Sequence, residues 1–135
     1  MTALVELAGS PDFNDRADAG RALASFVEVP DARRTLRDLV LDAGDTFVTR
    51  VTAEALLRRQ DTAGLAVVAS ALAAADPNHA DWIHTAVLDV FMVFGSERDA
   101  AVRECAALTR SPDGHVRDGA TRLLGTLVEI EPVLL

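Results

Sequence analysis

The chain has 135 residues, half of them apolar, and carries 21 acidic residues against 13 basic ones, a net charge of −8. This length is typical of one domain with a sizeable core. The acidity disfavours generic binding to nucleic acid or to an anionic membrane, and no apolar run approaches the ~18 residues of a membrane span. All 13 basic residues are Arg, which excludes Schiff-base and P-loop lysine chemistry.

Cys105 is the only cysteine, so no disulfide can form within the chain. The N-terminus shows no basic–apolar–small cleavage pattern, and we expect a cytoplasmic location. The excess of Ala, Arg, Asp and Val is typical of a high-GC genome, which favours a bacterial origin.

Helix-period apolar patterns run along the whole chain, and no window shows the alternation of a β-strand. Shorter amphipathic helices are predicted over about residues 2–9, 30–43, 61–75 and 96–109. For the last of these, Ser96 and Asp99 form a loose capping signal. The sequence therefore predicts an all-α protein.

Between these shorter helices, four related patterns recur. They end on Leu23, Leu56, Phe91 and Leu124, which are spaced by 33, 35 and 33 residues. Within each pattern, apolar residues return at offsets of three, four and seven or eight, as on one face of an α-helix. Helix pairs of this length cannot bury both faces alone, so neighbouring pairs must stack.

An aspartate stands eleven residues before three of these landmarks, at Asp12, Asp45 and Asp113. Such a side chain accepts hydrogen bonds from the free N–H groups of a first helical turn. The third pattern has Ala80 at this position with Asp81 beside it, and we expect its helix to begin there. The aspartates therefore predict a helix start that is used repeatedly.

The phrase SPDGHVRDGATRLLG at residues 111–125 resembles the HEAT-repeat signature, in which Pro-Asp precedes a helix with Val-Arg, small residues, Leu and Gly. SPDFNDRADAGRALA at residues 10–24 resembles it too. In the middle units Arg50 stands one place late and His84 replaces the Arg. The resemblance implies that the motif Asp and Arg residues tie adjacent units together.

The resemblance also implies a right-handed α–α superhelix of about four helix pairs that forms one domain over residues 1–135. Its units would span about 10–43, 44–75, 76–110 and 111–135, after a short helix at 2–9. In this family the second helices of the pairs line a concave inner surface that holds a partner.

Ten side chains on these inner helices are predicted to bind the partner, and seven of them, all except Asp81, Trp82 and Met92, are expected on the solvent side. Their mixed charge suits a specific protein surface better than a polyanion. They are Arg21, Glu54, Arg58, Asp81, Trp82, Thr85, Asp89, Met92, Asp118 and Arg122.

The third inner helix carries more apolar surface than one buried stripe needs, because Trp82, Leu88 and Met92 are left over. Either the helix is buried on two sides or it exposes an apolar patch to a partner. Its central position favours burial. If the helix is exposed, Trp82 and Met92 are natural binding anchors.

Other chemistry finds little support. His79, Asp81 and His84 have ligand-like spacing, but no fourth zinc ligand is evident, and surface or capping roles are expected. Cys105 stands one helical turn from Ala101 and reads as a core residue rather than a nucleophile. We therefore expect no metal, no cofactor and no enzymatic activity.

The Arg pairs at 33–34 and 58–59 lack the interleaved aromatic residues that stack nucleic-acid bases. HEAT-like DNA-repair glycosylases use a concave basic cleft with Trp and acidic residues, roles that Trp82 and Asp81 could fill. The chain is short and acidic for that activity.

The sequence favours a non-enzymatic protein–protein interaction scaffold, such as an adaptor, a regulator or an immunity-type protein, that is monomeric or weakly homo-oligomeric. One alternative is a HEAT-like domain that assists an enzyme or a chromophore, as in lyase- or chaperone-like proteins. Another is self-association through the ends of the superhelix.

Overall fold

The computed structural model describes all 135 residues and consists of eight α-helices. They are α1 (Thr2–Ala8), α2 (Phe13–Leu23), α3 (Pro30–Val40), α4 (Thr46–Leu57), α5 (Thr62–Ala74), α6 (Pro77–Phe91), α7 (Gly95–Leu108) and α8 (Gly114–Glu129). A 3-10 turn at Ala24–Phe26 follows α2, and one isolated bridge joins Phe94 to Leu134. The all-α prediction is confirmed. None of these helices combines the length and the apolarity needed to cross a bilayer.

Aspartate side chains begin three of the helices as predicted. Asp12 accepts a hydrogen bond from the backbone N–H of Asn14 at 2.8 Å, and Asp45 accepts one from Phe47 at 2.8 Å. Asp113 accepts from His115 at 3.0 Å at the start of α8. Each bond pairs an N–H group that the helix itself leaves free.

The start of α6 differs from the prediction. The helix begins at Pro77 rather than near Asp81, and the Asp76 carboxylate accepts from the backbone N–H of His79 at 2.7 Å. Proline is well placed in a first helical turn because its missing N–H would have no partner there. Asp81 consequently lies inside the helix, where it is exposed to solvent.

The start of α7 also differs, because Ser96 does not cap it. The helix begins at Gly95 and has no side-chain cap. Instead, the backbone N–H of Gly95 donates to the carbonyl oxygen of Leu134 at 2.7 Å. A carbonyl oxygen of the C-terminal tail thus accepts a hydrogen bond from an N–H group at the start of α7, as a capping side chain would.

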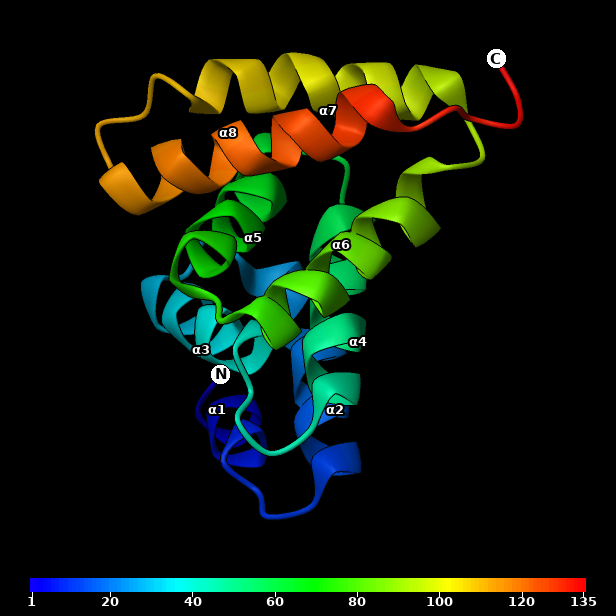
Figure 1. Ribbon diagram of the computed structural model, residues 1–135. Helices are drawn as coiled ribbons and strands as arrows, with labels where there is room; N and C mark the ends of the chain where they lie inside the picture. Colours follow the sequence, from blue (N-terminus) through cyan, green and yellow to red (C-terminus); the bar gives the residue numbers. More distant parts are fainter.

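Alternate helices of the chain pack side by side in two rows (Figure 1). One row contains α2, α4 and α6, and the other contains α1, α3 and α5. The last two helices, α7 and α8, lie together across one end of the molecule (top in Figure 1). Here the arrangement changes, because α8 packs more extensively on α5 than on α6.

Small and branched aliphatic side chains fill the core, and Phe91 is its largest buried member. Two helices approach closely at Gly119 of α8, which lies against the backbone of Ala69 in α5. An ion pair ties α2 to the turn after α3, since Arg16 Nε and Nη2 donate to the two Asp42 oxygens at 2.9 and 3.1 Å. This bidentate bond is the main cause of a raised Arg16 pKa.

Candidate functional site on the row of α2, α4 and α6

The solvent-facing side of the first row forms the candidate site, which we call the α2–α4–α6 surface. It includes seven of the ten residues that the sequence singled out. They are Arg21 on α2, Glu54 on α4, Arg58 just after α4, Trp82, Thr85 and Asp89 on α6, and Met92 just after α6.

A hollow of about 220 Å³ lies between α2 and α4 on this surface. Val51 and Ala55 supply its apolar lining, and Arg21, Glu54 and Arg58 supply the charges. The structure therefore brings three of the predicted residues around one depression. Because both signs of charge are present, the hollow can pair with a donor and with an acceptor of a partner.

The Glu54 carboxyl group has a raised pKa. Partial burial is the main cause of its raised pKa; Arg50 opposes the shift, and the nearby Asp89 carboxylate adds to it. Arg50 donates only one long hydrogen bond to Glu54, at 3.5 Å. The carboxylate is therefore incompletely solvated and incompletely paired, so a donor brought by a partner would stabilise its charged form.

Arg58 and Asp89 are the free charges of the surface. Both are exposed, and neither has an oppositely charged group within 4.0 Å. Arg21 does have one, since its Nη1 donates to Asp18 at 3.1 Å, but both side chains are more than half exposed. An exposed pair of this kind contributes little to stability and is readily exchanged.

The apolar residues left over on α6 are exposed. Trp82 is 37% exposed, and Leu88 and Met92 are each 43% exposed. The burial favoured by the central position of this helix is therefore wrong. Since α8 packs mainly on α5, the flank of α6 that a following helix would cover stays open.

Asp118 and Arg122 of α8 are exposed but stand apart from the hollow. Arg122 Nη1 donates to the carbonyl oxygen of Leu72 in α5 at 3.2 Å, away from the first row. On α6, the Thr85 hydroxyl donates to the carbonyl oxygen of Asp81 at 3.0 Å and is thus occupied within its own helix. Asp118 and Arg122 stay predicted contacts that the structure does not place on the α2–α4–α6 surface.

The candidate metal ligands do not converge. His79 lies between Asp76 Oδ1 at 2.8 Å and the carbonyl oxygen of Asp42 at 2.6 Å, whereas the His84 ring bonds Thr126 Oγ1 at 3.0 Å. No three His, Cys, Asp or Glu side chains lie close enough to share a metal ion. Cys105 is fully buried, and this burial raises the pKa of its thiol to about 12.

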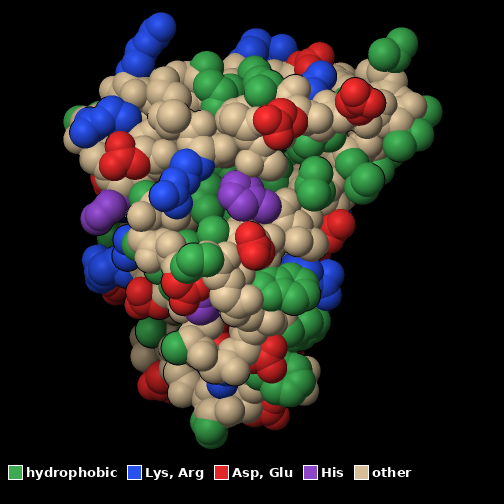
Figure 2. All heavy atoms as spheres, in the orientation of Figure 1, with side chains coloured by type: hydrophobic (Ala, Val, Ile, Leu, Met, Phe, Trp, Pro, Cys, Tyr) green, Lys and Arg blue, Asp and Glu red, His purple; other side chains and the backbone are tan.

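Sequence reasoning missed an apolar cluster where the C-terminal tail meets the end of α6. The backbone N–H groups of Val133 and Leu134 donate to the carbonyl oxygens of Met92 and Val93 at 2.9 and 2.7 Å, and all four side chains are exposed. Figure 2 shows hydrophobic side chains gathered there. The sequence could have indicated this cluster through two uncharged runs, VFMVFG at 90–95 and PVLL at 132–135.

No protein-family model matches the chain, and no curated protein matches it. Among solved structures, the crystal structure of an engineered protein is similar over 97% of this chain, with 24% sequence identity and a TM-score of 0.36. The alignment covers 63% of the engineered protein, so this chain spans less than two thirds of its length. A TM-score of this size assigns neither a fold family nor a function.

Proposed function

We propose that the chain is a non-enzymatic, HEAT-like protein-binding module that holds a partner protein on the α2–α4–α6 surface. The observation that carries this proposal is the exposure of Trp82, Leu88 and Met92 on a helix in the middle of the fold. The proposed role is that of an adaptor, a regulator or an immunity-type protein in the bacterial cytoplasm.

The apolar side chains supply the anchors. Leu88 and Met92 stand four residues apart and share one strip of the helix, while Trp82 lies nearer its start. Large apolar side chains left in water are costly, and aromatic and thioether groups contribute strongly at protein interfaces. A partner that buries these exposed side chains would therefore gain hydrophobic free energy on binding.

The charges supply the selectivity. Arg58 and Asp89 lack ion-pair partners, and the half-buried Glu54 has a raised pKa because its carboxylate is partly desolvated. A partner surface with both signs of charge would satisfy these groups together. Glu54 and Asp89 would repel a phosphate backbone, as would the net charge of −8, so a protein partner is favoured over a nucleic acid.

The HEAT-like part of the proposal is supported by the packing. Alternate helices stack in two rows, as helix pairs in a superhelix do. The aspartate caps of α2, α4 and α8 recur at the repeat spacing, and the Arg16–Asp42 ion pair links α2 to the turn after α3 within the first unit.

Affinity capture from lysate of the native host, followed by mass spectrometry, tests the function. Three variants define the result: Asp89→Arg and Trp82→Ala on the proposed surface, and Glu6→Arg on exposed α1 as the matched charge-reversal control. We expect a partner that wild type and Glu6→Arg retain and that both surface variants lose while circular dichroism shows unchanged helicity. The purified partner should then bind wild type directly, with affinity reduced at least about tenfold by Asp89→Arg.

Two outcomes would contradict the proposal. A partner retained equally by all the variants would bind elsewhere on the molecule. Loss of helicity in Trp82→Ala and Asp89→Arg would show that these positions serve the fold rather than recognition.

A further inference from the structure

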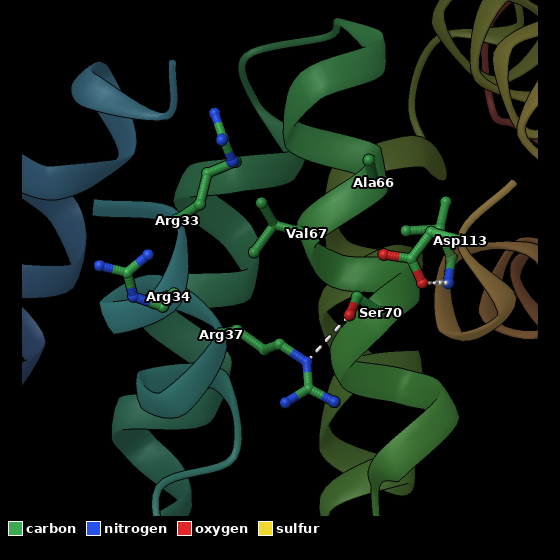
Figure 3. Close-up of a pocket in the computed structure, with 8 residues that line it drawn as sticks. Arg33, Arg34, Arg37, Ala66, Val67, Ser70 and Asp113 are labelled. Atoms are coloured by element: carbon green, nitrogen blue, oxygen red, sulfur yellow. Dashed lines mark hydrogen bonds between the residues drawn. The ribbon is translucent and has the colours of Figure 1, made fainter. Parts of the chain in front are cut away.

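A second hollow lies outside the α2–α4–α6 surface, between α3, α5 and the beginning of α8 (Figure 3). It has a volume of about 290 Å³. Its lining combines three arginines with an apolar floor, and consists of Arg33, Arg34, Arg37, Ala66, Val67, Ser70, Asp113 and Val116.

Two of these arginines are held in place by neutral groups. Arg37 Nε donates to Ser70 Oγ at 2.9 Å, and its two terminal nitrogens donate to no group of the chain. Arg33 Nη1 donates to the carbonyl oxygens of Val27 and Glu28 at 3.2 and 2.9 Å. Neither guanidinium has a carboxylate within 4.0 Å, whereas Arg34 pairs with Asp31. An acidic chain therefore leaves two positioned positive charges without a counter-charge.

The floor of the hollow is apolar. Val67 lies at its centre on α5, with Ala66 beside it and Val116 contributed by α8. Val67 and Val116 are almost fully buried, so the floor is part of the packed core and keeps its shape. A ligand that covers this floor must bring an apolar body.

Asp113 fixes the direction in which a ligand can lie. It stands across α5 from Arg37 (Figure 3) and accepts from the N–H groups of His115 and Val116 at 3.0 and 3.3 Å. Because its carboxylate already occupies the start of α8, a phosphate finds no free helix N-terminus there and meets a like charge. A negative group is attracted only toward the α3 side.

We propose that this hollow binds a hydrophobic carboxylate. The Arg37 terminal nitrogens receive the carboxylate, Arg33 adds long-range attraction, and a short aliphatic or aromatic body covers Val67 toward α8. The volume stands near the lower end of small-ligand pockets, roughly 300–1,000 Å³, which limits the body to a few carbon atoms. The carboxylate could belong to a free acid or to the C-terminal residue of a polypeptide.

Sodium hexanoate is the probe that tests the site, with hexanol and inorganic phosphate as controls for the charge and for the apolar body. Titration followed by NMR should move the Val67 methyl and Arg37 Nε–H signals in a saturable way for hexanoate alone. Arg37→Met should weaken hexanoate binding about tenfold or more, since it removes a charge-assisted bond. Arg103→Met, at an exposed position on α7, should leave it unchanged.

A second variant keeps the test decisive if Arg37→Met fails to fold. Ala66→Glu places an acidic side chain in the floor of the hollow, beside Val67, without removing any hydrogen bond, and it should abolish hexanoate binding. Equal binding of hexanol, equal binding of phosphate, or binding that survives both variants would overturn the proposal, as would the absence of saturable shifts.

A second pair of probes distinguishes a free carboxylic acid from the C-terminal carboxylate of a polypeptide. N-acetyl-valyl-leucine presents a peptide C-terminus, and its C-terminal amide presents the same body without the charge. If the acid binds at least tenfold more tightly than hexanoate and the amide does not bind, the ligand is a polypeptide terminus. If hexanoate binds as well as the peptide acid, the ligand is a free carboxylic acid.

Discussion

Gly119 in α8 lies directly against the backbone carbonyl of Ala69 in α5. A Cβ atom at position 119 would overlap the Ala69 oxygen and carbonyl carbon, so only glycine permits this approach. The contact holds α8 over α5, in the most extensive helix pairing of the molecule. The exposed flank of α6, with Leu88 and Met92, follows from this placement.

Replacing Gly119 with alanine should lower the free energy of unfolding by roughly 2–3 kcal/mol, because the new methyl group meets backbone that cannot rotate away. Urea unfolding followed by circular dichroism measures the change. Gly125→Ala is the matched control in the same helix, since no atom lies within 4 Å of the added Cβ. There the better helix propensity of alanine should raise stability by up to about 1 kcal/mol. Similar effects of the two changes would show that the close approach is absent.

Thr49 and Thr52 on α4 are completely buried, and neither hydroxyl has a hydrogen-bond partner. Thr49→Val replaces one such hydroxyl with a methyl group of similar size. We expect the free energy of unfolding to rise by about 1 kcal/mol, because an unpaired polar group no longer has to be desolvated. Thr121→Val, at an exposed position of α8, should change stability by less than about 0.5 kcal/mol. A destabilised Thr49→Val would mean that the hydroxyl has a partner in solution.

His79 should make stability depend on pH. Its ring faces an acceptor at each nitrogen, Asp76 Oδ1 and the Asp42 carbonyl oxygen, so the doubly protonated ring makes both hydrogen bonds. The bond to Asp42 is the main cause of a pKa raised above the ordinary 6.5. The resulting stability is fully present below pH ~6.5 and is lost as the pH rises through the folded-state pKa.

Urea unfolding at several pH values between about 6 and 9 checks this expectation. Wild type should lose more stability over that range than His79→Gln, and the His79 ring signals in NMR should titrate above pH 6.5. The opposite order of pH dependence, or a ring that titrates below 6.5, would contradict the assignment of a protonated His79.

Cys105 should be inert in the folded protein. Burial is the main cause that raises the pKa of its thiol to about 12, so almost no thiolate exists near neutral pH, and the sulfur is inaccessible. Ellman's reagent at pH 8 should label it only after urea unfolds the chain. Rapid stoichiometric labelling under native conditions would show that α7 opens readily.

Local signals in the sequence were sufficient for the helices and insufficient for their packing. Apolar periodicity and the aspartate starts at Asp12, Asp45 and Asp113 are properties of neighbouring residues, and the three helices that these aspartates begin form as predicted. At α6, the repeat spacing predicted a start at Asp81, whereas the helix is capped five residues earlier, at Asp76, and begins at Pro77, because proline suits a first helical turn. The position of α8 depends on Gly119 meeting Ala69, fifty residues away in the chain, which no local pattern encodes.

At the candidate site, too, local signals in the sequence were sufficient for some residues and insufficient for others. Helical phase is enough to place Arg21, Glu54 and Arg58 on the solvent side, and the structure adds that they surround one hollow. Helical phase does not predict that Arg122 turns toward Leu72, because that direction depends on which helix lies beside α8. The hollow beside Arg37 is likewise formed by three helices from separate parts of the chain.

The hydrogen bonds between the C-terminal tail and the turn before α7 bear on the order in which the chain folds. Most helices pack on helices one or two places away, and such short loop closures favour rapid folding. The bonds of Gly95 and Leu134 instead need α7 and α8 to be in place first. They therefore form late, and the amide hydrogens of these two residues report the opening of the last helix pair from the rest of the protein.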